Sequence, residues 1–324
     1  MRAARTHEAG EPTPAAPLAA TPLHRIAAAL AHDGLWLDVG HATLRVQGDS
    51  PHLPAQLRAV YRHFPFIDRA EWADVHCRLD RPRGLRRWLK PQVVFVSDAA
   101  SIFSPFPADA PLPLFEWGCN WLIGHRMNDR LLLHAGALER DGHALLLPAT
   151  PGSGKSTLTA ALSLRGWRLL SDEFGVVDPD TGLVHAMLKP VALKNESIAV
   201  IRAFEPGATL GPSFPKTRKG TVAHLAASAD AVARRHEAAQ PAAVVLPRWE
   251  AGSSTRFEPV TPDTAFAALA FNAFNYQLLG ETGFDTVVRL ARQCLAWQLV
   301  YSELDDAIDT LDRAWPQALE AAAR

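Results

Sequence analysis

The chain has 324 residues, of which 48% are hydrophobic and 21% are charged, so it can bury the core of one large domain or two ordinary ones. Its formal net charge of −1 at pH 7 gives no electrostatic reason to expect nucleic acid or an anionic membrane as a partner. The three cysteines are far apart and form no CxxC pair, which disfavours a disulfide framework or a zinc site. Without a membrane-length apolar run or a secretory signal, a cytoplasmic protein is expected.

The first 128 residues predict a disordered tail and then a small α+β domain. The tail, residues 1–20, is rich in Ala, Pro and Thr. In chain order we expect a helix over 21–32, strands over 35–40 and 42–48, a helix over 54–64, strands over 74–80 and 92–98, a proline-rich loop over 105–113 and a buried helix over 114–127. The basic stretch "RPRGLRRWLK" at 81–90 is typical of a solvated hairpin tip, with contact to an acidic partner as the alternative.

Residues 129–324 predict a second domain, of α/β type. Its first segment, "RLLLHAGALERDGHALLLPAT", has two apolar runs around Asp141-Gly142, which predicts a β-hairpin because glycine tolerates the positive φ of such turns. The second run leads into a glycine-rich loop. "KSTLTAALSLRG" then predicts a helix that ends at Gly166, and "WRLLSDE" predicts a strand that ends in acids. Over 285–315 we expect two packing helices.

The glycine-rich loop "ATPGSGKST", residues 149–157, matches the phosphate-binding pattern G-x-x-x-x-G-K-[ST] except at its first position, which is Ala149. In such loops consecutive backbone N–H groups curl around phosphate oxygens at the start of a helix, and Gly152 and Gly154 permit the required backbone. Lys155 is expected to reach the β- and γ-phosphates, and Ser156 to ligate Mg²⁺. The candidate nucleotide-binding residues are Pro151, Gly152, Ser153, Gly154, Lys155, Ser156 and Thr157.

This prediction depends on the backbone at position 149, and it has one alternative. Alanine is tolerated at position 149 if its φ is negative. The alternative interpretation is a glycine and serine turn that merely caps a helix, but a predicted strand before the loop and a predicted helix after it favour a nucleotide site.

The acids that follow the next predicted strand are Asp172 and Glu173. A carboxylate at that point of a phosphoryl-transfer site holds Mg²⁺ or accepts a proton from the attacking hydroxyl. The alternative is a solvated turn, since "SDEFGVVDPDTG" is rich in turn residues. His134, between Leu133 and Ala135, is by spacing alone a buried, hydrogen-bonded residue rather than a catalyst.

Three segments together, "HAGAL", "ATPGSGKST" and "RGWRLLSDE", resemble the catalytic domain of bacterial HPr kinase/phosphorylase. The runs "KPVALKNESI", "KTRKGTVAHL", "VVLPRWE" and "FNAFNYQLLGETGF" resemble the branch called HPr kinase-related kinase A. The resemblance covers the chain from about residue 130 onward. It implies a P-loop fold related to phosphoenolpyruvate carboxykinase, and serine phosphorylation with a nucleotide and Mg²⁺.

The resemblance also implies roles for individual residues. Asp172 matches a base, Glu173 a metal ligand, and His134 a histidine near the phosphates. The chain departs from the family at Ala149, Pro151, Ala135 and Glu173, where the family has Gly, Ser, Gly and Asp. These departures leave open which protein accepts the phosphate and whether the reverse phosphorylase reaction occurs. A homo-oligomer is also left open, because the first half does not resemble the N-terminal domain of HPr kinases.

Several basic residues downstream could stabilise the transferred phosphoryl group. They are Lys189, Lys194, Lys216, Arg218, Lys219 and Arg248. Each also suits an ordinary surface position, and we favour Lys194 and Arg218. "PSFPKTRKGT" has the composition of a mobile lid, and Asn272, Asn275 and Tyr276 are expected to be capping or core polar groups.

The sequence therefore predicts an ATP- and Mg²⁺-dependent kinase that acts on a Ser or Thr hydroxyl of a protein or peptide. The nucleotide is either ATP or GTP, because the sequence contains no recognisable motif that distinguishes the two bases. A small-molecule kinase on the same scaffold and a non-catalytic nucleotide-binding switch are the alternatives.

Overall fold

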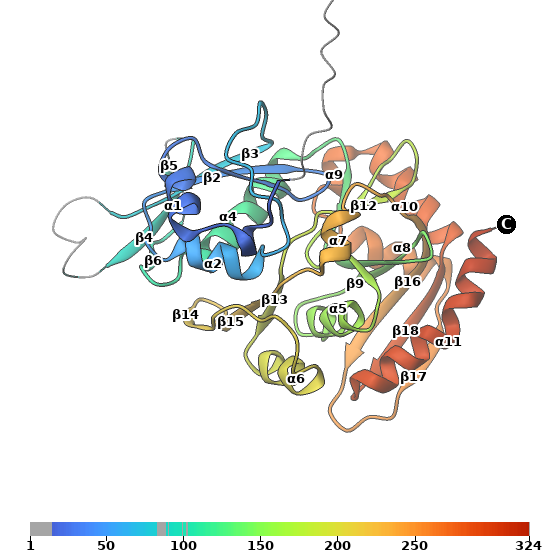
Figure 1. Ribbon diagram of the computed structural model, residues 1–324. Coiled ribbons are helices and arrows are strands. Elements are labelled where there is room, and N and C mark those ends of the chain that lie inside the picture. Colours follow the sequence, from blue (N-terminus) through green and yellow to red (C-terminus); the bar gives the residue numbers. More distant parts are fainter. Residues whose placement is uncertain (1–14, 83–88, 90, 99, 102, 324) are drawn as a thin grey trace, which may run out of the picture.

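The computed structural model describes residues 15–82, 89, 91–98, 100–101 and 103–323, which form a mixed α/β structure whose two halves lie side by side (Figure 1). The first half contains η1 (Leu18–Ala20), α1 (Leu23–Ala31), β1 (Leu35–Asp38), β2 (Thr43–Gly48), α2 (Leu53–Val60), β3 (Val75–Asp80), β4 (Gln92–Ser97), β5 (Ala100–Ser101), β6 (Phe106–Pro107) and α4 (Pro111–Arg126).

A single sheet organises the first half, in the order β1-β2-β3-β4-β5, with β6 also paired to β4. Along β2 and β3 every second residue is buried, because one face of the sheet packs on the core while the other faces solvent. Helix α1 contacts β2, and α4 contacts β3 and β4. Helix α4 begins at Pro111, three residues before the predicted start, since proline suits the first turn of a helix.

The predicted helices and strands of this half are confirmed, except that α2 ends at Val60 and not at residue 64. The loop predicted over 105–113 is wrong in part, because it contains β6 and the first turn of α4. Within the predicted tail, Leu18 is buried and its N–H donates to the Phe64 carbonyl over 2.8 Å, so part of residues 1–20 is ordered; residues 1–14 lie outside the described residues. Most of the basic stretch 81–90 also lies outside them. The boundary expected after residue 128 falls between α4 and β7.

The second half contains the remaining elements. They are β7 (Leu131–Leu133), β8 (Ala135–Arg140), β9 (His143–Pro148), α5 (Lys155–Leu164), β10 (Arg168–Ser171), β11 (Gly175–Val177), β12 (Val184–His185), β13 (Val191–Lys194), α6 (Glu196–Phe204), β14 (Phe214–Thr217), β15 (Gly220–Leu225), α7 (Ala229–Ala233), β16 (Gln240–Trp249), β17 (Arg256–Pro259), α8 (Pro262–Phe271), α9 (Tyr276–Leu279), α10 (Glu281–Gln293), β18 (Leu295–Tyr301) and α11 (Leu304–Ala322).

The central sheet of the second half has the order β10-β8-β9-β16-β18-β17. Strands β9, β16 and β18 are parallel. Strand β8 is antiparallel to both β9 and β10, so β10 runs in the same direction as β9. The carboxyl ends of β9, β10, β16 and β18 therefore meet at one edge of the sheet, which is where open α/β sheets bind ligands.

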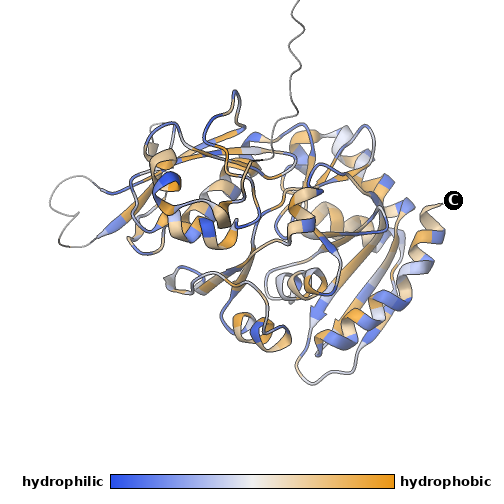
Figure 2. Cartoon of the chain, in the orientation of Figure 1, coloured by the Kyte–Doolittle hydropathy of each residue, from blue (hydrophilic) through white to orange (hydrophobic). Residues whose placement is uncertain are grey.

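Both faces of this sheet are covered. On one face, Leu145 and Ala243 line a small void with Leu311 and Trp315 of α11, and α5 contacts β8 and α11. On the other face, Leu146 approaches Gly175 of β11. Hydrophobic residues run along the strands as a result (Figure 2).

Two expectations for this half need correction. The segment 285–315 contains parts of two helices, α10 and α11, as predicted, but it is not helical throughout, because the unpredicted β18 lies between them. Its sequence "LAWQLVY" is a short apolar run that periodicity alone does not assign to a helix or a strand. The predicted hairpin is confirmed, with φ of 55° at Asp141 and 76° at Gly142, but its first arm begins at Ala135, and residues 131–133 form β7 of a separate three-stranded sheet.

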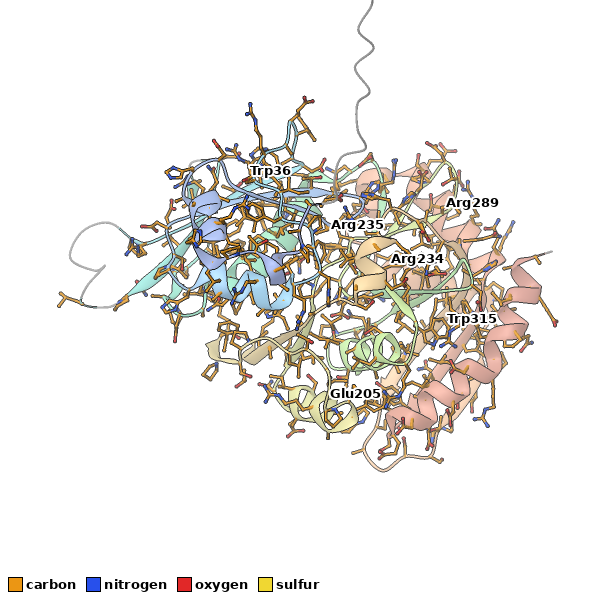
Figure 3. The ribbon with its side chains drawn as sticks, in the orientation of Figure 1. Trp36, Glu205, Arg234, Arg235, Arg289 and Trp315 are labelled. Carbon is orange, nitrogen blue, oxygen red and sulfur yellow. The ribbon has the colours of Figure 1, made fainter. Side chains whose placement is uncertain are left out.

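Polar contacts hold the two halves together. Arg235, which is labelled in Figure 3, lies beside α7. It donates to an Asp38 carboxylate oxygen of β1 over 2.7 Å. Lys189 forms a buried ion pair with Glu116 of α4 at 2.9 Å, and the Tyr61 hydroxyl donates to the other carboxylate oxygen of Glu116 over 2.6 Å. These contacts fix α4 against the second half, next to the edge where the strands end.

Candidate functional site

The glycine-rich loop lies between β9 and α5, at the edge where the parallel strands end. Gly152 has a φ of 89° and Gly154 a φ of 86°, a region that side chains disfavour. A Cβ on Gly154 would lie 2.5 Å from the Tyr301 Oη and 2.9 Å from the Trp249 Cβ, so the packing around this position also leaves no room for a side chain. The φ of Ala149 is not positive, so the backbone at this position tolerates alanine in place of the usual glycine.

Neighbouring strand ends hold the loop in place. The Trp249 N–H, at the end of β16, donates to the Ser153 carbonyl over 2.9 Å. The Tyr301 hydroxyl, at the end of β18, donates to the Gly154 carbonyl over 3.1 Å, and burial raises the pKa of Tyr301, which keeps this donor protonated. The loop is therefore fixed by the sheet on which it sits.

The start of α5 is suited to an anion. Among the residues that the structure describes, no side chain caps it, and its first turn carries no acidic residue. Its first backbone N–H groups and the positive end of the helix dipole can therefore face an anion. Ser153 Oγ is buried without a described partner. These features are what a phosphate group requires at a helix N-terminus.

Lys155, the first residue of α5, contacts Asp172 directly. Its Nζ lies 2.9 Å from Asp172 Oδ1 and also donates to the Asp172 carbonyl, and the two residues are only 7% and 4% exposed. Asp172 Oδ2 is buried and has no hydrogen-bond partner among the described residues. One oxygen of this carboxylate is thus held by the lysine, and the other is available to a further donor.

Glu173 and His134 lie beside this pair. His134 Nε2 is 3.7 Å from Glu173 Oε2. Burial by itself raises the pKa of Glu173, but the charges of Lys155, Lys194, His134 and Lys219 outweigh it and lower this pKa to about 2. Burial and the charge of Lys155 lower the pKa of His134. Glu173 is therefore a carboxylate at neutral pH, surrounded by cations.

Residues of the loop line two cavities. The Trp249 cavity has a volume of about 850 Å³, and its lining includes Thr157, Trp249 and Tyr301. The Trp121 cavity has a volume of about 590 Å³, and its lining includes Pro151, His134, Glu173 and Trp121. Lys194 lines both cavities, which places a cation where their contents would meet.

Asn195, the residue after Lys194, has a strained backbone with φ of 52° and ψ of −120°. Its Oδ1 accepts from the Thr221 N–H over 3.0 Å, and its own N–H donates to the Thr221 carbonyl over 2.9 Å. Strain of this kind is retained where the surroundings over-determine the backbone. It sets the direction in which the chain leaves Lys194.

The structure thus gathers the predicted residues Lys155, Asp172, Glu173 and His134 in one place. His134 lies between β7 and β8, and its N–H donates to the Asn272 carbonyl over 2.6 Å. Ser156 lies in the first turn of α5, directly after Lys155.

The basic candidates separate into two groups. Lys194, Arg218 and Lys219 line the Trp121 cavity. Lys189 instead forms an ion pair with Glu116. Arg248 is exposed and forms an ion pair with Glu250 at 2.6 Å. The side chain of Lys216 lies outside the described residues.

Sequence reasoning missed the contribution of the first half. Residues of α4 form a wall of the Trp121 cavity, namely Pro113, Glu116, Trp117, Asn120, Trp121, Gly124 and His125. The signal was present, because "EWGCNWLIGHR" is unusually rich in tryptophan. Its helical burial suggested a core role only. Asn275 is a core polar group as expected, since its Oδ1 accepts from the Leu132 N–H over 3.0 Å.

A scan against models of protein families and a search of curated proteins found no match to this chain. In the part of the chain that the structure describes, no helix is both long enough and apolar enough to cross a membrane. Among the same residues, no three His, Cys, Asp or Glu side chains gather in a way that could hold a metal ion.

Proposed function

We propose that this chain is a nucleotide-dependent kinase that transfers a γ-phosphate to a Ser or Thr hydroxyl of a protein or peptide. The observation that carries the proposal is the buried contact between Lys155 and Asp172 at the end of a phosphate-binding loop. Asp172 Oδ2 has no hydrogen-bond partner among the described residues, and residues of the loop line two cavities. The resemblance of the sequence to HPr kinase-like proteins supports the same conclusion.

The Trp249 cavity suits the nucleotide. It adjoins the start of α5 through Thr157, and its volume of about 850 Å³ is within the range of cavities that hold small-molecule ligands. The Trp249 side chain is 48% exposed and offers a flat face on which a purine could stack. ATP and GTP both fit this reasoning.

The transfer follows from the residues around the loop. The loop N–H groups and Lys155 hold the β- and γ-phosphates, and Lys194, between the cavities, stabilises charge on the γ-phosphoryl oxygens. The acceptor oxygen forms a bond to the γ-phosphorus while the bond from that phosphorus to the β-γ bridging oxygen breaks, and the nucleoside diphosphate leaves. Asp172 Oδ2 takes the hydroxyl proton.

A Mg²⁺ ion that accompanies the nucleotide fits the residues present. Such an ion uses one or two carboxylates beside phosphate oxygens and waters, so it does not need a cluster of three protein ligands. Glu173, ionised at neutral pH with its pKa near 2, and the Ser156 hydroxyl would hold it. When bound, the ion neutralises charge on the phosphates.

A small-molecule kinase is the competing function, because the Trp121 cavity of about 590 Å³ is also large enough for a metabolite. A nucleotide-binding switch is the second competitor. The Asp172→Asn substitution distinguishes the two functions. A switch would still bind nucleotide and keep its function, whereas a kinase that uses Asp172 as the base would lose most of its transfer rate.

The experiment is incubation of γ-labelled ATP and Mg²⁺ with cognate cell lysate and wild type, Lys155→Ala or Asp172→Asn. We expect a discrete labelled band with wild type alone. If ATP binds in a Lys155-dependent manner and no protein is labelled, the protein-kinase proposal is wrong, and labelled metabolites in the same lysate would then identify the small-molecule kinase.

A further inference from the structure

The Trp121 cavity has features that a generic acceptor pocket does not need, and they indicate what occupies it. Its walls come from both halves of the molecule. Trp117 and Trp121 belong to α4 of the first half, and His134 and Glu173 belong to the second half. An acceptor in this cavity would therefore be recognised by the first half while it reacts in the second.

Behind this cavity lies a recess of about 20 Å³ that Asp172 lines. Glu173 and Asn120 line both the recess and the Trp121 cavity, so the two spaces adjoin. A volume of this size holds about one water-sized group. A hydroxyl at the end of a short side chain fits it, and a tyrosine phenol ring does not.

Aromatic contacts stiffen the cavity wall. The Trp121 and His125 rings lie 4.1 Å apart between centroids, and the Phe174 and Phe274 rings 5.0 Å apart. Arg218, from the turn between β14 and β15, lies over the Trp117 ring with its Cζ 5.5 Å from the centroid. Rings held in this way present a preformed apolar surface to a ligand.

The apolar surface continues outside the cavity. Phe274 and Leu278 line it yet are 52% and 73% exposed. We call Phe274 and Leu278 the apolar rim. A small molecule enclosed in the cavity would leave this rim in water. Exposed apolar residues grouped at the mouth of a site are typical of contact with another macromolecule.

We propose that the acceptor is a polypeptide segment whose Ser or Thr enters the recess at Asp172 while a large apolar residue next to it packs between the α4 tryptophans and the apolar rim. This inference rests on the proposed kinase function and adds the acceptor's sequence preference to it. The basic residues Lys194, Arg218 and Lys219 also line the cavity and face the charge that the transfer places on the acceptor.

The test uses the full-length protein, γ-labelled ATP, Mg²⁺ and three acceptors. These are a peptide library with a fixed central Ser and degenerate flanks, the same library with a central Tyr, and a mixture of small hydroxyl compounds. We expect label in the Ser library only, with Leu, Ile, Met or Phe enriched beside the Ser. The variants are Leu278→Ser and Trp121→Ala, and nucleotide titration of each shows that it has folded.

On a selected peptide, each variant should lower kcat/KM about 10- to 100-fold, mainly through KM, because it removes the burial of one large apolar side chain. Trp72→Ala is the matched control, since Trp72 is an exposed tryptophan beside a separate cavity of the first half, and it should leave kcat/KM unchanged.

The outcomes separate this inference from the proposed function. Labelled Ser peptides without an apolar preference, or with a preference that both variants retain, would overturn the inference and leave a kinase. Label in the small compounds alone would overturn both the inference and the protein-kinase proposal, and would identify a small-molecule kinase. No label in any acceptor, from a protein that binds ATP, would refute both.

Discussion

Gly154→Ala is the substitution for which the structure gives the most specific expectation. An alanine at a φ of 86° is destabilised by about 1–2 kcal/mol. Its Cβ would also lie 2.5 Å from the Tyr301 Oη and 2.9 Å from the Trp249 Cβ, and overpacking of this kind adds about 1–3 kcal/mol. We expect a total loss of about 2–5 kcal/mol in the free energy of unfolding, or an equivalent loss of nucleotide affinity if the loop moves to relieve the contact.

Two other glycines provide matched controls. Gly152 (φ 89°) and Gly142 (φ 76°) have nothing within 4 Å of an added Cβ, so alanine at either should lower stability by about 1–2 kcal/mol only. Gly142 lies in the hairpin turn at the opposite end of β9, so nucleotide affinity should change in Gly152→Ala and not in Gly142→Ala. Urea unfolding and titration with a fluorescent nucleotide measure both quantities. Equal stability of Gly154→Ala and Gly152→Ala, with equal affinity, would refute the argument from close packing.

Three further predictions concern the surroundings of the loop. Tyr301→Phe removes the hydroxyl that donates to the Gly154 carbonyl, and it should lower stability by about 0.5–1.5 kcal/mol in urea unfolding and weaken nucleotide binding; unchanged values would show that this bond does not hold the loop. Lys189→Met leaves Glu116 buried without its cation and should destabilise by about 3–5 kcal/mol, whereas Lys189→Met with Glu116→Leu should recover much of the loss; a double variant no more stable than the single one would contradict this. Burial lowers the pKa of His224 from 6.5 to about 4, so the unfolded chain binds a proton between these values that the folded chain does not, and stability should fall by up to about 3 kcal/mol as pH drops through that window. His224→Leu should remove this part of the pH dependence in unfolding at pH 7 and pH 4.5, and an unchanged slope would count against it.

Local patterns sufficed for the parts of the site that lie close together in the sequence. The phosphate-loop pattern and the acids after the next strand predicted that Lys155 and Asp172 share one site, since both follow strands whose carboxyl ends meet at one edge. The Asp141-Gly142 turn was also predictable from local sequence, because this pair of residues tolerates the positive φ that a tight hairpin turn requires.

Long-range contacts could not be predicted in the same way. The sequence of β18 suits a buried helix as well as a buried strand. It forms a strand because it pairs with β16 in the sheet. The wall that α4 supplies to the Trp121 cavity depends on how the two halves dock, through pairs such as Lys189 with Glu116. A helix rich in tryptophan looks like core in the sequence whether or not a cavity adjoins it.

The most direct test of the central claim is the rate of γ-phosphate transfer by Asp172→Asn at saturating nucleotide, measured beside its nucleotide affinity. The variant keeps the shape of the side chain near Lys155 but loses a base. The account predicts that it still binds ATP and transfers phosphate at least about 100-fold more slowly than wild type. Transfer at the wild-type rate would contradict the role of Asp172, and with it the proposed mechanism.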